Sequence, residues 1–170
     1  MTDQYSISFQ EDGSPYSQKF DDIYFDTDDG YQQSEAVFIG ANELSHKFSQ
    51  LNSTSEMTIA ETGFGTGLNF LLTIKYLFSQ FNASESQLLP SITYITTEKF
   101  PLTKAELAKS LAILPQLSTY AKLLILQYPD QVTEDCKLSF YDGKITLELL
   151  YGDATESLTK LEPSKHRRAN

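Results

Sequence analysis

The hydrophobic pattern is weak at the start of the chain. Polar and turn-forming residues interrupt the apolar ones over the first forty positions, so we expect irregular or short extended structure there. Leu44, Phe48 and Leu51 then recur at helical spacing and predict a helix over about residues 41–51. We therefore expect an N-terminal extension, residues 1–56, that contains short strands and one helix.

From residue 57 onward, strand-like and helix-like runs alternate. "MTIAE" is short, apolar and bounded by glycine, which is typical of a buried parallel strand. The stretch from Leu68 to Phe81 is apolar on nearly every side, which predicts a helix packed between a sheet and further structure. "SITYITTE" predicts the next strand, which ends at Glu98.

The remaining elements follow from local signals. Thr103 and Glu106 have the spacing of a capping box and predict the start of a helix, and Pro115 should end that helix before another begins. "KLSFYDGKITLELLYGDA" predicts two strands around the turn at Asp142–Gly143. The order of strands and helices predicts an α/β, Rossmann-like parallel sheet, in which ligands bind at the carboxyl ends of the strands.

Composition and charge narrow the class of protein. The 170 residues suffice for one domain with a real core. The first residues have neither a basic nor an apolar leader pattern, and no apolar run reaches about 18 residues, so we expect a soluble, cytoplasmic protein without a membrane segment. The formal net charge of −10 argues against a broad nucleic-acid surface but allows a local one.

Metal and cysteine chemistry have little support. Cys136 is the single cysteine, and His46 and His166 lie far apart without a partner at metal-ligand spacing. We therefore expect no metal site.

The stretch "ETGFGTGLNF" carries the strongest chemical signal. Its glycines at alternate positions predict a turn with positive φ, where the main chain can touch a ligand that a Cβ would exclude. A dinucleotide fingerprint fails because its third glycine would fall at Leu68, and the carboxylate of Glu61 would repel a pyrophosphate. No Gly-Lys-Ser/Thr follows, so a P-loop is excluded as well.

S-adenosylmethionine satisfies both observations, because it carries positive charge and no phosphate. Glu98 can accept hydrogen bonds from both ribose hydroxyls with its two oxygens. Asp153, at the third strand end, can face the adenine amino group. Acidic residues at three successive strand ends, beside a glycine turn, therefore predict a pocket for this cofactor.

The same motif resembles that of a known family. "ETGFGTGLNF" is similar to the first motif of the class I tRNA 5-methylaminomethyl-2-thiouridine methyltransferases, which include the methyltransferase half of MnmC-type bifunctional proteins. "FDDIYFDTDDGYQQSEAVFIGANEL", "EKFPLTKAEL" and "LLYGDA" resemble further segments of that family. The resemblance spans most of residues 20–162.

The resemblance implies methyl transfer from S-adenosylmethionine to the aminomethyl nitrogen of a modified wobble uridine in tRNA. It places the methionine and ribose at the first motif, the ribose at Glu98, and adenine between the residues that follow the second and third strands. The cofactor-binding residues that it implies are Glu61, Gly63, Phe64, Gly65, Gly67, Asn69, Glu98, Lys99, Phe100, Asp153 and Ala154.

The family's catalytic acid lies in a fourth strand that this sequence does not contain. We therefore expect a fragment that ends at Asn170 before the acid, is inactive alone, and lacks any FAD-binding oxidoreductase half. Two other interpretations stay open. One is a binding module that keeps the methyltransferase fold, and the other is a methyltransferase that acts on a protein or a small molecule, which the acidic charge suits better.

Overall fold

The centre of the molecule is a four-stranded sheet. The computed structural model describes residues 7–81 and 86–161. The strands are β4 (Glu56–Thr62), β5 (Ser91–Glu98), β6 (Cys136–Phe140) and β7 (Ile145–Tyr151), in the order β4-β5-β7-β6. β4, β5 and β7 are parallel, and β6 runs antiparallel to β7. The predicted parallel sheet and the hairpin at Asp142–Gly143 are therefore confirmed.

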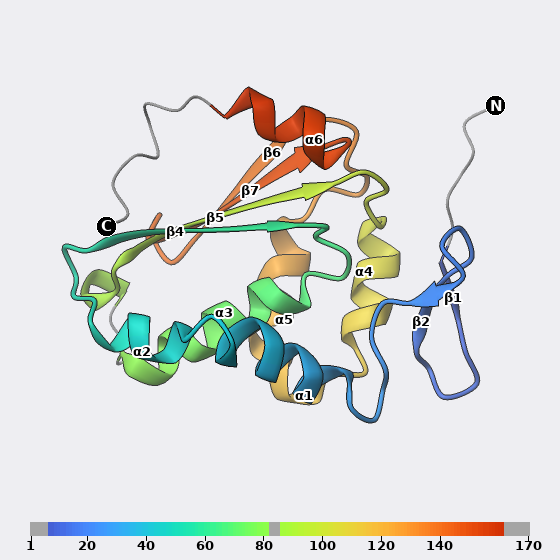
Figure 1. The fold of residues 1–170 in the computed structure, drawn as a ribbon, viewed down its shortest axis with the longest axis horizontal. Coiled ribbons are helices and arrows are strands. Elements are labelled where there is room, and N and C mark those ends of the chain that lie inside the picture. Colours follow the sequence, from blue (N-terminus) through green and yellow to red (C-terminus); the bar gives the residue numbers. More distant parts are fainter. Residues whose placement is uncertain (1–6, 82–85, 162–170) are drawn as a thin grey trace.

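Helices cover the two faces of this sheet unequally. The helices are α1 (Gly30–Ser34), the π-helix η1 (Glu35–Gly40), α2 (Leu44–Ser49), α3 (Leu68–Gln80), α4 (Lys104–Leu111), α5 (Ser118–Gln127) and α6 (Ala154–Ser157). Short 3₁₀ turns are η2 (Ser86–Leu88), η3 (Pro115–Leu117) and η4 (Leu158–Lys160). Figure 1 shows α1 to α5 on one side of the sheet and α6 on the other. No described helix is long and apolar enough to span a membrane.

Helix α3 lies in the middle of the core. The ring of Phe70 packs edge-on against Tyr94, with centroids 5.2 Å apart, and its centroid is 5.7 Å from that of Phe140. On its other sides α3 contacts α2, η1 and α5. Its apolar residues are therefore buried all round, as the sequence predicts, and α3 fixes the loop that precedes it against the sheet.

A second, smaller sheet comes from the N-terminal part of the chain. Strands β1 (Ile7–Phe9), β2 (Pro15–Ser17) and β3 (Asp22–Ile23) pair antiparallel. The amide of Ile7 donates to Glu106 Oε1 on α4 at 3.3 Å, and Lys109 Nζ of α4 lies 3.8 Å from the ring centroid of Phe9. Figure 1 shows this sheet beside α4. The expected short strands are confirmed.

Residues 30–40 differ from the expectation. We expected irregular or short extended structure up to residue 40, and this is wrong for α1 and η1, which are helical. The apolar residues of η1 are consecutive rather than spaced at helical period, so the sequence shows no amphipathic pattern. Ile39 is buried whereas Val37 is 68% exposed, and contact with α3 selects the helical state.

The capping box at α4 is formed. Thr103 Oγ1 accepts from the amide of Glu106 at 3.3 Å, and Glu106 Oε2 accepts from the amide of Thr103 at 2.8 Å. Glu106 also accepts from Ile7, so this cap connects α4 to the N-terminal sheet.

We predict that Thr103→Ala lowers the free energy of unfolding by about 1 kcal/mol, because the amide of Glu106 loses its acceptor. Chemical denaturation followed by circular dichroism measures this change. Thr119→Ala, an exposed position on α5, is the matched control and should stay close to wild type. Equal losses in both variants would contradict the role of the cap.

Candidate functional site

An open cleft of about 910 Å³ lies at the carboxyl ends of the parallel strands, between them and the N-terminal sheet. Seven of the eleven predicted cofactor-binding residues line it, and four lie outside its lining. The seven are Gly63, Gly65, Glu98, Lys99, Phe100, Asp153 and Ala154, and the four are Glu61, Phe64, Gly67 and Asn69. The strand ends therefore meet at one site, as expected for a parallel sheet.

Glu98 lies at the centre of this site. Its Oε2 accepts from the amide of Gly65 at 2.8 Å, and its Oε1 accepts from the amide of Phe100 at 2.8 Å. Its backbone carbonyl accepts from the amide of Gly152 at 2.9 Å. The loops after β4, β5 and β7 thus all bind one residue. Each carboxylate oxygen has a second lone pair, so the pair can still accept from a ligand.

The turn after β4 has the backbone that its glycines predict. Gly63, Gly65 and Gly67 all have positive φ, which confirms that prediction. At Gly67, a Cβ would lie 2.7 Å from Phe64 Cζ, so a side chain there would displace the ring. At Gly65, a Cβ would lie 3.3 Å from Tyr24 Cδ1. The turn is therefore closely packed from below by Phe64 and from the cleft side by Tyr24.

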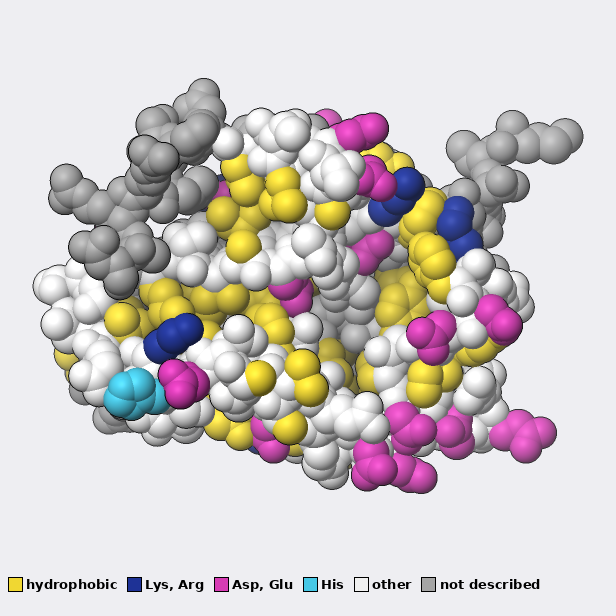
Figure 2. All heavy atoms as spheres, in the orientation of Figure 1, with side chains coloured by type: hydrophobic (Ala, Val, Ile, Leu, Met, Phe, Trp, Pro, Cys, Tyr) yellow, Lys and Arg dark blue, Asp and Glu magenta, His cyan; other side chains and the backbone are white. Residues whose placement is uncertain are grey.

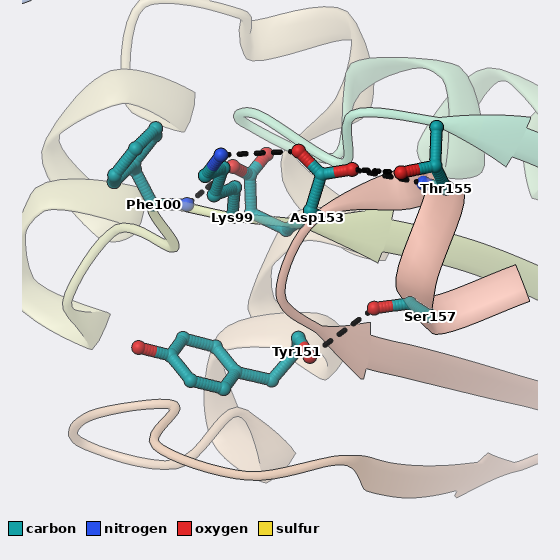
Figure 3. Close-up of polar contacts among 7 residues, drawn as sticks. Lys99, Phe100, Tyr151, Asp153, Thr155 and Ser157 are labelled. Atoms are coloured by element: carbon teal, nitrogen blue, oxygen red, sulfur yellow. Dashed lines mark hydrogen bonds and ion pairs between the residues drawn. The ribbon is translucent and has the colours of Figure 1, made fainter. Parts of the chain in front are cut away.

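Asp153 connects the end of β7 to the end of β5. Its Oδ2 lies 3.0 Å from Lys99 Nζ, and its Oδ1 accepts from the amide and hydroxyl of Thr155 at the start of α6 (Figure 3). These hydrogen bonds lower the pKa of Asp153 to about 2. The hydrogen bond from the Thr155 side chain has the largest effect, and that from Lys99 is second. Asp153 is thus both the N-cap of α6 and one side of a polar bridge at the cleft.

Glu61 points away from the cleft. Its Oε2 accepts from Asn69 Nδ2 at 3.0 Å, which connects the end of β4 to the first turn of α3. Its Oε1 is buried and makes no hydrogen bond to a described residue. Burial raises the pKa of Glu61 to about 7, and the polar groups of Asn69, Tyr94 and Thr96 oppose this only in part.

The orientation of Glu61 had a signal in the sequence. Side chains alternate along a strand, so Glu61 shares a face with Met57 and Ile59, which pack toward the helices. The carboxyl group therefore lies beneath the glycine turn, and Asn69 lies there with it.

Sequence reasoning did not find the opposite wall of the cleft. This wall comes from the N-terminal sheet and consists of Ser17, Lys19, Phe20, Asp22, Ile23 and Tyr24. Figure 2 shows that acidic side chains gather over the N-terminal part of the molecule, at the lower right of the view. Most of this wall falls within the "FDDIYF" block. The sequence therefore contains this motif but does not show that it lies at the cleft.

The buried carboxyl of Glu61 generates a prediction about pH. Its pKa is raised from 4.5 to about 7 in the fold, so between these values the folded state holds a proton that the unfolded state has released. Stability should therefore fall as pH rises through this window, by about 1 to 3 kcal/mol.

Glu61→Gln should remove this fall, because the amide does not titrate. Denaturant titrations at a series of pH values test the expectation, and Glu56→Gln, an exposed carboxyl on the same strand, should keep the wild-type dependence. A Glu61→Gln profile that matches wild type would show that Glu61 is not the group responsible.

The comparisons with known proteins agree with this geometry. No model of a known protein family matches the chain. The chain is 40% identical over 156 residues to the tRNA 5-methylaminomethyl-2-thiouridine biosynthesis bifunctional protein MnmC of Pseudomonas savastanoi pv. phaseolicola. The match covers 92% of this chain and 23% of that protein, so the chain spans about a quarter of the length of this relative.

A solved structure shows the same fold. MnmC2 from Aquifex aeolicus matches with a TM-score of 0.61 at 19% identity, over 94% of this chain and 46% of that chain. The resemblance that the motifs predict is thereby confirmed: the chain has the Rossmann-like class I methyltransferase fold and is homologous to part of the MnmC-type proteins of the tRNA 5-methylaminomethyl-2-thiouridine methyltransferase family.

Proposed function

We propose that the protein carrying this chain is a tRNA methyltransferase. It uses S-adenosylmethionine to methylate the aminomethyl nitrogen of 5-aminomethyl-2-thiouridine at the wobble position. The relative from Pseudomonas is named for the biosynthesis of the methylated nucleoside and is called bifunctional. For a second, oxidative activity in such a protein, FAD is the cofactor that the resemblance implies.

The observation that carries this proposal is the position of Glu98. Glu98 lies at the end of β5, its carboxylate is fixed by two backbone amides, and the residue lines a cleft bordered by glycine. A carboxylate held in this way suits the two vicinal hydroxyls of a ribose. Gly65 lines the same cleft, and a Cβ there would lie 3.3 Å from Tyr24 Cδ1. The residues present therefore fit a cofactor that contains adenosine.

The other predicted residues take two kinds of role in this proposal. Lys99, Phe100, Asp153 and Ala154 surround the adenine, while Gly63 and Gly65 present bare main chain to the ribose and methionine part. Glu61, Phe64, Gly67 and Asn69 support the turn from beneath, because they lie outside the lining of the cleft.

The chemistry places modest demands on these residues. Bound S-adenosylmethionine supplies a methyl group that its sulfonium already activates for in-line displacement. The chain has to hold the donor at a fixed distance and angle and to keep water from it. The fixed carboxylate of Glu98 and the tightly packed glycine turn provide this orientation.

Glu98→Gln tests the cofactor site directly. The substituted amide must present its NH₂ group to the amide of Gly65 or of Phe100, which are both donors, so the local structure and the ribose contact are lost together. We expect the affinity of the complete protein for S-adenosylhomocysteine, measured by calorimetry, to fall at least about tenfold.

Glu56→Gln, at the opposite end of the sheet, is the matched control and should bind like wild type. Wild-type affinity in Glu98→Gln would remove the main support for the proposal.

The substrate is tested in the cell. Deletion of the gene should cause 5-aminomethyl-2-thiouridine to accumulate at the wobble position and abolish the methylated form, as measured by mass spectrometry of tRNA nucleosides. Complementation with the wild-type gene should restore the methylated form. An unchanged nucleoside profile would exclude this substrate while leaving the cofactor open.

A further inference from the structure

The segment Lys19–Tyr24 forms the wall of the cleft that faces the glycine turn. We propose that this segment belongs to the cofactor site itself, with Tyr24 against the ribose and methionine part and Phe20 against the adenine. The inference rests on the proposed use of S-adenosylmethionine and extends it to the N-terminal sheet, whose residues neither the motif nor the relatives' names assign.

The segment is held in a defined position. The amide of Tyr24 donates to the carbonyl of Pro15 at 2.8 Å, and the hydroxyl of Tyr16 donates to Asp21. Asp21 has a φ of +54°, so the turn before Tyr24 has a conformation that non-glycine residues rarely adopt. The sheet is attached to α4 through Glu106. Phe20 and Tyr24 therefore reach the cleft from a fixed support.

Tyr24 lies over the part of the turn that Glu98 binds. A Cβ on Gly65 would lie 3.3 Å from its ring, and the amide of Gly65 donates to Glu98 Oε2. Burial raises the pKa of Tyr24 to about 12, and the charge of Glu98 adds to this, so the phenol stays neutral. A ligand bound by Glu98 on this side therefore meets an uncharged aromatic ring.

Phe20 lies in the cleft beside Phe100, the residue whose amide binds the other oxygen of Glu98. Phe20 is 60% exposed, and the centroid of its ring is 5.6 Å from that of Phe100. The amide of Phe100 donates to Glu98 Oε1, so this aromatic pair has a fixed position relative to the ribose site. Lys19 Nζ lies 3.7 Å from the centroid of the Phe100 ring. An exposed phenylalanine beside a cleft offers a surface on which a nucleobase can pack.

Each ring is therefore next to a loop that Glu98 binds, and the two loops differ. One is next to the loop that Oε2 binds, and the other is next to the loop that Oε1 binds. A ribose held by this carboxylate has its base on one side and its methionine chain on the other, which matches the two aromatic contacts. A tRNA nucleotide packed on Phe20 would leave Tyr24 without a role, whereas the cofactor uses both rings.

The test is a calorimetric titration of the complete protein with two ligands. S-adenosylhomocysteine contains the adenosine and the amino-acid part of the cofactor, and 5′-methylthioadenosine lacks the amino-acid part. We expect Phe20→Ala to weaken both ligands about tenfold, by loss of the base contact. Tyr24→Leu should weaken S-adenosylhomocysteine more than 5′-methylthioadenosine.

Phe20→Tyr and Tyr24→Phe keep the rings and should bind like wild type. Leu126→Ala, a surface change on α5 with a side chain that is 74% exposed, should also have no effect. Thermal unfolding of each variant shows whether it folds like wild type.

The outcomes separate this inference from the proposed function. If wild-type protein does not bind S-adenosylhomocysteine, both are wrong. If wild type binds and the folded Phe20→Ala and Tyr24→Leu variants match it, only the inference is overturned. If Phe20→Ala weakens tRNA binding alone, the segment contacts substrate rather than cofactor, and the inference is again overturned.

Discussion

The arrangement of the site depends on one carboxylate. Glu98 binds the amide of Gly65 after β4 and the amide of Phe100 after β5 through its side chain, and the amide of Gly152 after β7 through its carbonyl. Two of these hydrogen bonds go to the carboxylate, and hydrogen bonds to a charged group are stronger than those between neutral groups. The third goes to the backbone carbonyl, so one residue connects three loops. The loops come from neighbouring parallel strands, and only at their carboxyl ends do they meet.

The core beneath the site keeps the loops that Glu98 binds in place. Phe70 of α3 packs against Tyr94 and Phe140, so the helix that follows the glycine turn cannot shift independently of the sheet. Below the turn, Glu61 holds Asn69 while it is itself buried with a raised pKa. A buried carboxyl of this kind reduces stability when it ionises, which is a common cost of precise geometry at functional sites.

Most of the domain from residue 57 onward could be predicted from the sequence. Strands bounded by glycine and acid, the capping box at Thr103 and the turn at Asp142–Gly143 are local signals, and local chemistry decides them. The helical state of residues 30–40 could not be predicted, because contact with α3 decides it and no period of 3.6 is visible. The domain boundary at residue 56 stays a prediction. Residues before and after this position in the sequence both line the cleft.

The candidate site was predictable on one wall only. Glu98 and Asp153 follow directly from their places at strand ends, whereas Tyr24 reaches Gly65 across 41 positions of sequence through a separate sheet, for which no spacing rule exists.

The most direct test of the account is a crystal structure of the complete protein with S-adenosylhomocysteine. We expect the ribose hydroxyls to bind the Glu98 carboxylate, with the hydrogen bonds of Glu98 to Gly65 and Phe100 kept. A ligand bound elsewhere, or one that leaves Glu98 without a ribose contact, would contradict it.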